Sequence, residues 1–278
     1  MDKIAIISDI HGNLEALIAV LKDIKERKIE RIICLGDIIA KGANQKECVE
    51  LIKKHCDVVL KGNCEDFFTK DIDLSTQDKI TSERIKWNRS KLSEDDINYL
   101  SNLPFCYEFY LSGRLVRLLH STPESLYDES GNLNSLDGFY KLLLPSDNTI
   151  SNKKADIVIC GHTHTPYVQK IYNRTIINSG SVGDSLDIFR NDEKDGNIFN
   201  TTVANYLILS GNYSSKNINE KISYELISIP YDIDKELETN QNNIELDAYK
   251  EELKNGKYRD MDKLHKVFEK NGLDINKI

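Results

Sequence analysis

Short apolar runs alternate with helical periodicity over the first 62 residues. The runs at 3–8, 31–36 and 57–62 are rich in β-branched residues and predict buried strands. Between them, residues 13–28 and 44–55 carry apolar side chains at helical spacing. The order of strand, helix, strand, helix and strand predicts a parallel sheet.

The pattern changes along the rest of the chain. Residues 76–101 are predicted to be helical, and two strand-like runs follow near 105–111 and 114–119. Further strands are expected at 155–160, 167–172, 174–179, 205–210 and 221–229. Residues 184–202 predict a long polar loop, and the charged segment 231–278 predicts a helical appendage. Strand–helix pairs followed by consecutive strands predict an α/β fold of two stacked sheets with helices outside.

Length, cysteine content and charge limit the class of protein. A chain of 278 residues can bury a sizeable core without disulfides or a structural metal. Its six cysteines form no CxxC pair, and its first apolar run is too short for a signal peptide or a membrane span, so we expect a cytoplasmic protein. The formal net charge of -8 argues against broad binding to nucleic acid or an anionic membrane. A phosphate-bearing substrate would need a local positive charge.

Metal-capable side chains follow five of the predicted strands. The strand ends read SDIHGN, LGDII, KGNCE, LLHST and ICGHTH. The candidate ligands there are Asp9, His11, Asp37, Asn63, His120, His162 and His164. Because the carboxyl ends of strands form the ligand crevice of open α/β sheets, we expect these side chains to converge. His162 and His164 project to the same side and could serve one metal centre or two neighbouring ones.

The ordered motifs DxH, GD, GN, H and GHxH resemble the calcineurin-like metallophosphoesterase superfamily. The resemblance covers about residues 1–230, and the segments at 87–104 and 178–183 are similar to its small bacterial phosphodiesterase-like branch. It implies a four-layer αββα sandwich of two mixed sheets flanked by helices. Residues 64–101 would form a helical cap-like insertion in the domain 1–230, and 231–278 a C-terminal helical extension.

The resemblance also implies two divalent metal ions. One would be bound by Asp9, His11, Asp37 and His164, and the other by Asp37, Asn63, His120 and His162. Seven ligands are too many for one ion but suit two that share Asp37. Two divalent ions would outweigh the two aspartates and attract a phosphate. Ligation by nitrogen and oxygen alone favours transition metals, with Mn²⁺ expected first and Fe, Co, Ni or Zn as alternatives. Such a pair can generate a bridging hydroxide that attacks phosphorus.

Several residues near the ligands receive weaker predictions. We expect Asp37, Asn63, His120 and Glu65 to carry catalysis, with Glu65 and the neighbouring Asp66 orienting a ligand or a water. Residues 180–183 (GSVG) could form a backbone wall near the phosphate or an ordinary turn.

The chain departs from the superfamily pattern directly after Asn63. Many members read GNH, where the histidine can protonate the leaving group, but this chain has Cys64. A thiol near its reference pKa is a poor acid, whereas a phosphate leaving group needs little protonation. The substitution therefore favours phosphoanhydrides and activated diesters.

The predicted function is hydrolysis of phosphodiester or phosphoanhydride bonds in small nucleotide-like substrates, with two metal ions. The alternatives are a phosphoprotein phosphatase or a nuclease with the same site, or a non-catalytic metal-binding scaffold. The acidic charge and the lack of a basic, aromatic groove weigh against nucleic acid, and the complete ligand set weighs against a scaffold. No nucleic-acid or membrane partner is expected, and the oligomeric state is left open.

Overall fold

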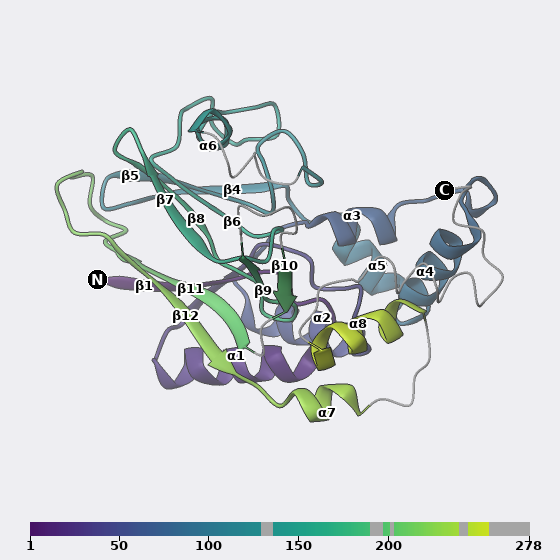
Figure 1. Ribbon diagram of the computed structural model, residues 1–278. Coiled ribbons are helices and arrows are strands. Elements are labelled where there is room, and N and C mark those ends of the chain that lie inside the picture. The colour runs from purple at the N-terminus through teal and green to yellow at the C-terminus, as the bar shows by residue number, and fades with distance from the viewer. Residues whose placement is uncertain (129–135, 190–196, 201–202, 239–243, 256–278) are drawn as a thin grey trace.

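Two five-stranded sheets lie face to face in the computed structural model (Figure 1). It describes residues 1–128, 136–189, 197–200, 203–238 and 244–255. The first sheet has the order β12–β11–β1–β2–β3, and the second has the order β4–β5–β6–β8–β7. Both are mixed: in the first sheet β1, β2 and β3 are parallel and β11 and β12 pair antiparallel, and in the second sheet the parallel strands β5, β6 and β8 lie between the antiparallel edge strands β4 and β7.

The first sheet contains the predicted N-terminal strands. Its members are β1 (Asp2–Ile7), β2 (Arg31–Cys34), β3 (Val58–Val59), β11 (Val203–Gly211) and β12 (Ser223–Pro230). The second sheet consists of β4 (Cys106–Leu111), β5 (Arg114–Leu119), β6 (Ile157–Cys160), β7 (Tyr167–Ile171) and β8 (Arg174–Asn178). The parallel strands β1 and β2, and likewise β5, β6 and β8, end at the same edge of their sheet, so the loops that follow them come together.

Helices cover the outer faces of both sheets and one end of the sandwich. The helices are α1 (Leu14–Glu26), α2 (Gln45–His55), α3 (Asn63–Thr69), the 3₁₀ turn η1 (Leu74–Thr76), α4 (Lys79–Ser90), α5 (Glu94–Ser101), α6 (Leu136–Leu142), α7 (Ile233–Leu237) and α8 (Ile244–Asn255). Figure 1 shows α1 and α2 below the first sheet and α6 above the second. The expected four-layer αββα sandwich is therefore confirmed.

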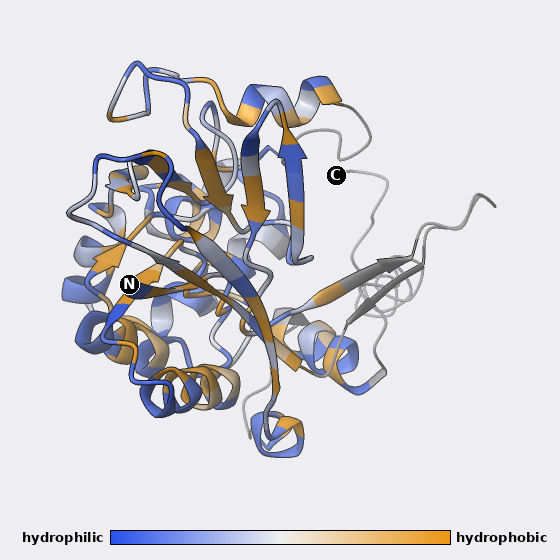
Figure 2. Cartoon of the chain, turned by 90° about the vertical axis from the view of Figure 1, so that its left-hand side faces the viewer, coloured by the Kyte–Doolittle hydropathy of each residue, from blue (hydrophilic) through white to orange (hydrophobic). Residues whose placement is uncertain are grey.

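Successive side chains of β1 point to opposite faces of the first sheet, and this alternation explains why an apolar core lies on each face. Ile4 and Ile6 belong to the apolar cluster between the two sheets, whereas Ala5 and Ile7 belong to the cluster under α1 and α2. All four side chains are buried, so this strand is apolar on both faces and reads as a continuous hydrophobic run. In Figure 2 the hydrophobic colour is concentrated on the inner strands and on the sheet-facing sides of the helices.

The structure corrects three element predictions. The segment 184–202 contains a hairpin of β9 (Leu186–Phe189) and β10 (Asn197–Asn200), whose apolar runs are too short to stand out in the sequence. The strand expected at 57–62 has only two residues, because the Lys61 N–H leaves the sheet and donates to the Pro104 carbonyl. Helix α6 lies in a region for which the pattern predicted no element.

The remaining helical predictions are confirmed where the chain is described. The region 76–101 is divided between α4 and α5, because Ser93 caps α5 by accepting a hydrogen bond from the Asp96 N–H. Helices α7 and α8 follow residue 231, and residues 256–278 lie outside the described part. The domain boundaries stay a prediction. No helix in the described ranges is both long and apolar enough to cross a bilayer.

Candidate metal centre

Six of the predicted ligand residues lie in tight loops at one edge of the two sheets, and the seventh, Asn63, begins α3 there. Backbone hydrogen bonds tie these loops together, for example from the Asp9 N–H to the Gly36 carbonyl and from the Gly161 N–H to the His120 carbonyl. Five of the seven candidates have left-handed φ angles of 51–66°: Asp9, His11, Asp37, His162 and His164. Such conformations are costly for residues other than glycine and concentrate at functional sites.

Asp9, His11 and His164 form the first group of donors. The His11 and His164 Nε2 atoms are 3.0 Å apart, and Asp9 Oδ1 lies 3.4 Å from His164 Nε2. All three residues are at most 5% exposed. The three donors satisfy the spacing expected of ligands to one ion.

Asp37, Asn63, His120 and His162 form the second group. His120 Nε2 lies 2.9 Å from Asn63 Oδ1 and 3.6 Å from Asp37 Oδ1, and the His120 and His162 rings are 5.2 Å apart. The other carboxylate oxygen of Asp37 is 3.7 Å from His11 Nε2 in the first group. Asp37 therefore lies between the two groups, which is the position that a shared ligand would require.

The chemistry of the donors fits divalent cations. Three histidines direct Nδ1 to backbone carbonyl oxygens: His11 to Ile39 at 3.3 Å, His120 to Leu35 at 3.1 Å and His164 to Asp184 at 2.7 Å. These contacts leave Nε2 facing the centre, which is the usual arrangement of metal-binding histidines. Asp9 Oδ1 is buried, and it has no hydrogen-bond partner among the described residues. Ligand atoms about 2.0–2.2 Å from one ion lie roughly 3–3.5 Å apart, close to the separations seen here.

Burial and the charges of neighbouring groups shift the pKa values of these residues. Burial opposes ionisation of Asp9 and Asp37, but the neighbouring histidines hold both pKa values below their usual range. Burial also opposes protonation of His164, but Asp9 and Asp184 raise its pKa to about 10. Burial lowers the pKa of His11 and of His162 to about 4. The carboxylates are thus ionised at neutral pH, as metal ligation requires.

An ion pair behind His164 was missed by the sequence reasoning. Lys41 pairs with Asp184 Oδ2, and that oxygen lies 3.0 Å from His164 Nδ1. Both residues are buried, at 6% and 0% exposure. Asp184 directly follows the GSVG segment, which was the available signal, whereas nothing local marks Lys41. Ser181 in that segment donates to the Asp9 carbonyl at 2.7 Å, so its side chain joins two loops.

Glu65 contacts backbone rather than a candidate ligand atom. Its Oε2 accepts hydrogen bonds from the N–H groups of Asp37 at 2.7 Å and Gly62 at 2.9 Å, and its Oε1 accepts from Ile38 at 2.8 Å. Burial and the Asp37 charge raise the pKa of Glu65 to about 7, while these N–H donors favour the carboxylate. Glu65 thereby fixes the loop that carries Asp37.

Cys64 lies beside Asp37, at the boundary between the two donor groups. Its thiol donates to Asp37 Oδ2 at 3.2 Å, and its backbone N–H donates to Asp37 Oδ1 at 2.8 Å. Burial, followed by the charge of Asp37, raises the pKa of the thiol. Cys64 is therefore a protonated side chain at neutral pH that helps to orient Asp37.

The second group is the more accessible side of the centre. Asn63, Cys64 and His162 are half-buried, whereas the residues of the first group, Asp9, His11 and His164, are buried. Tyr127 lies close to this side: its hydroxyl donates to Asp66 at 2.7 Å, and Asp66 belongs to α3, the helix that begins at Asn63. Asp66 thus points to Tyr127 and not to the predicted ligands. A substrate can approach beside this exposed ring.

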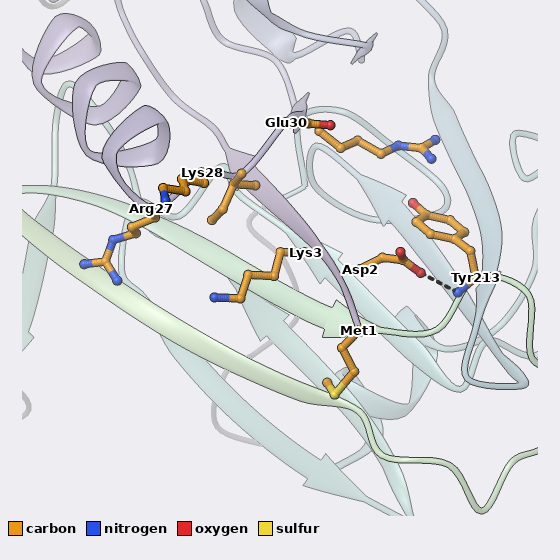
Figure 3. Close-up of a pocket in the computed structure, with 9 residues that line it drawn as sticks. Met1, Asp2, Lys3, Arg27, Lys28, Glu30 and Tyr213 are labelled. Carbon is orange, nitrogen blue, oxygen red and sulfur yellow. Dashed lines mark hydrogen bonds between the residues drawn. The ribbon is translucent and has the colours of Figure 1, made fainter.

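A separate surface pocket lies at the opposite end of β1 (Figure 3). It measures about 440 Å³, and its lining includes Lys3, Arg27 and Tyr213. The dashed line in Figure 3 joins the Tyr213 N–H to Asp2, which accepts this hydrogen bond at 3.0 Å. None of the predicted ligands lines this pocket, so it is distinct from the candidate centre.

Comparison with known proteins agrees with the motifs and the fold. The family model "Calcineurin-like phosphoesterase superfamily domain" matches residues 2–194, which include all seven predicted ligands. The uncharacterized protein MJ0912 of Methanocaldococcus jannaschii is 34% identical over 199 residues, covering 66% of this chain and 77% of the relative.

Two solved structures share the fold. A metallophosphoesterase from Sphaerobacter thermophilus has a TM-score of 0.61 and 22% identity, over 85% of this chain and 91% of that chain. The hypothetical protein PH1004 from Pyrococcus horikoshii has a TM-score of 0.66 and 16% identity, over 93% and 98%. Because the family model covers more than half of the sequence, the chain belongs to the calcineurin-like phosphoesterase superfamily.

Proposed function

We propose that this protein is a hydrolase that uses two divalent metal ions to cleave phosphodiester or phosphoanhydride bonds of small nucleotide-like substrates. The main support is the position of Asp37 between two groups of nitrogen and oxygen donors. In the proposal, one ion is held by Asp9, His11, Asp37 and His164, and the other by Asp37, Asn63, His120 and His162. Mn²⁺ is the first candidate, with Fe, Co, Ni or Zn as alternatives.

The protein's own residues prepare the site for a phosphate. Bound ions would supply positive charge for the phosphoryl oxygens and would lower the pKa of a water molecule. Glu65 holds the Asp37 loop through backbone N–H groups, so that Asp37 keeps its position between the groups. Asn63 and His162 line the accessible side and would meet the substrate first.

The environment of Cys64 supports substrates with good leaving groups. The thiol has a raised pKa and donates to Asp37, so it is a weak acid occupied by another acceptor. An alkoxide leaving group needs a proton from a well-placed acid, but a phosphate or an aryl oxide does not. Phosphoanhydrides and activated diesters are therefore the preferred substrates in this proposal.

Tyr127 supports a substrate with an aromatic part. Tyr127 is 47% exposed, its hydroxyl is anchored by the hydrogen bond to Asp66, and Lys70 Nζ lies 5.8 Å from the ring centre. Stacking of a base on an aromatic side chain contributes about 1–3 kcal/mol. A nucleobase could stack on this ring while its phosphate lies beside Asn63.

The six free cysteines support a reducing cytoplasmic location.

The test is a metal-reconstitution assay with a broad substrate panel. Chelator-treated protein is titrated with Mn²⁺, Co²⁺, Ni²⁺, Zn²⁺ and Fe²⁺, and hydrolysis is measured on nucleotide anhydrides, aryl and alkyl diesters, a phosphopeptide and single-stranded oligonucleotides. We expect two ions per chain and the highest activity on anhydrides and aryl diesters. Preference for the phosphopeptide or the oligonucleotide would establish a phosphatase or a nuclease instead. Metal binding without hydrolysis of any substrate would indicate a scaffold.

A further inference from the structure

The C-terminal helix α8 packs directly behind the candidate metal centre. Leu246, Tyr249 and Leu253 of α8 form an apolar cluster with Ala43, which lies in the loop after Asp37. Each of these four residues is at most 4% exposed. In Figure 1, α8 lies beside the helices that flank the first sheet. The contact is thus a buried interface.

The Tyr249 hydroxyl reaches the loop that carries Asp184. It donates a hydrogen bond to the Gly183 carbonyl and accepts one from Asn13 Nδ2 at 2.7 Å. Asn13 Nδ2 also donates to the Gly183 carbonyl at 3.0 Å. Tyr249 is 2% exposed, so these hydrogen bonds are shielded from water. They join α8 to Asn13, directly after the DIHG motif, and to Gly183, the last residue of the GSVG segment.

Gly183 and Asp184 in turn contact the first donor group. The Gly183 N–H donates to the Asp9 carbonyl at 3.0 Å, and Asp184 accepts from His164 Nδ1 through its side chain and its carbonyl. A Cβ atom at Gly183 would lie 1.9 Å from the Ile10 carbonyl oxygen, so this segment packs closely against the loop that carries Asp9 and His11. The Gly183–Asp184 segment is held between the centre on one side and Tyr249 on the other.

We propose that Tyr249 is a positioning residue of the metal centre and that α8 therefore contributes to metal binding. Tyr249 holds Gly183 and Asp184, and through them it holds His164 and Asp9. The ion bound by Asp9, His11 and His164 depends on this support, whereas the ion at Asn63, His120 and His162 does not. The inference rests on the proposed two-metal function, and it assigns a role to a segment outside the residues matched by the family model.

The first experiment compares Mn²⁺ binding to chelator-treated wild type and Tyr249→Phe by isothermal titration calorimetry. The variant removes one hydroxyl and keeps the ring. Loss of a partner that orients a metal ligand typically weakens metal binding about 10- to 100-fold. We expect that loss for one of the two ions, with the affinity of the other unchanged.

Tyr206→Phe is the matched control. Tyr206 is also buried, and its hydroxyl donates to Asp23 on α1, away from the predicted ligands. Both variants lose one buried hydroxyl, so their melting temperatures can be compared. The control should bind both ions like wild type. Equal weakening of metal binding in the two variants would show a general effect of stability and would refute the positioning role.

Two further variants identify which ion is affected and whether the effect passes through Asp184. The Asn63→Ala variant should bind only the ion of the first group tightly. Adding Tyr249→Phe to it should lower the affinity for that remaining ion. Asp184→Asn should weaken the same ion, and the Tyr249→Phe/Asp184→Asn double variant should lose less than the sum of the single effects, because both act through one contact path. Additive losses would contradict that path.

Failure of the inference differs from failure of the proposed function. If wild type binds two ions and hydrolyses a phosphoester, but Tyr249→Phe keeps both affinities, the positioning role is wrong. If wild type binds at most one ion, the two-metal function itself is wrong.

Discussion

Replacing the shared carboxylate is the most direct test of the candidate centre. Asp37→Asn keeps the size of the side chain and removes one negative charge. The two carboxylate oxygens lie 3.6 Å from His120 Nε2 and 3.7 Å from His11 Nε2, one in each donor group. We therefore expect both ions to bind more weakly, whereas Asn63→Ala should affect only the ion of the second group.

The size of the effect follows from electrostatics. At an effective dielectric constant of about 20, two unit charges 4 Å apart interact by about 4 kcal/mol. A ligand oxygen is closer than this to a divalent ion, so about 4 kcal/mol is a conservative figure for the loss at each ion. A difference of about 1.4 kcal/mol is tenfold in affinity, which gives roughly a thousandfold weakening. Hydrolysis at a fixed low Mn²⁺ concentration should be lost with it.

Calorimetric titration and metal analysis after dialysis measure this effect. Asp66→Asn is a suitable control, because Asp66 lies on α3 next to the centre but pairs with Lys70 and Tyr127. It should bind two ions with wild-type affinity. The shared role of Asp37 would be wrong if Asp37→Asn retained both ions with unchanged affinity, or if Asn63→Ala lost both ions while Asp37→Asn lost neither.

Four other predictions test the surroundings of the centre. Cys64→His should accelerate hydrolysis of alkyl diesters by about 10²- to 10⁴-fold if the position faces the leaving group. A uniform loss on all substrates with a lower melting temperature would show overpacking instead. Tyr127→Ala should raise the KM for nucleotides about tenfold and leave the KM for small alkyl phosphoesters unchanged, whereas Tyr127→Phe should retain nucleotide affinity. His164 has a pKa of about 10 without metal and must lose its proton to ligate. Apparent Mn²⁺ affinity at that site should therefore rise about tenfold per pH unit between roughly pH 6 and 9, with proton release detectable by calorimetry in different buffers. Burial raises the pKa of Glu236 from 4.5 to about 7, so the folded state holds more protons in this range. The contribution of Glu236 to the free energy of unfolding should fall by about 3 kcal/mol as the pH rises from 4.5 to 7, and urea titrations of wild type and Glu236→Gln should differ by this pH dependence.

The sequence by itself determined the layers of the fold and the identity of the candidate ligands. The β1 run is apolar on both faces, and such a pattern is specified locally by residue type and spacing. The strand-end motifs named all seven donors, because the parallel strands β1 and β2, and likewise β5 and β6, end at the same edge of their sheet. Short elements such as the β9–β10 hairpin carried too little pattern to be predicted.

Only the tertiary structure decided which side chains are partners. The His11 and His164 Nε2 atoms meet across 153 residues of sequence, and Lys41 meets Asp184 across 143. The two oxygens of Glu65 could equally have oriented a water, but the chain brings backbone N–H groups to them. Residue type and spacing in the sequence limit the contacts that a side chain can make. The choice among those contacts depends on distances between loops from different strands, and these are set only when both sheets and the C-terminal helix have packed.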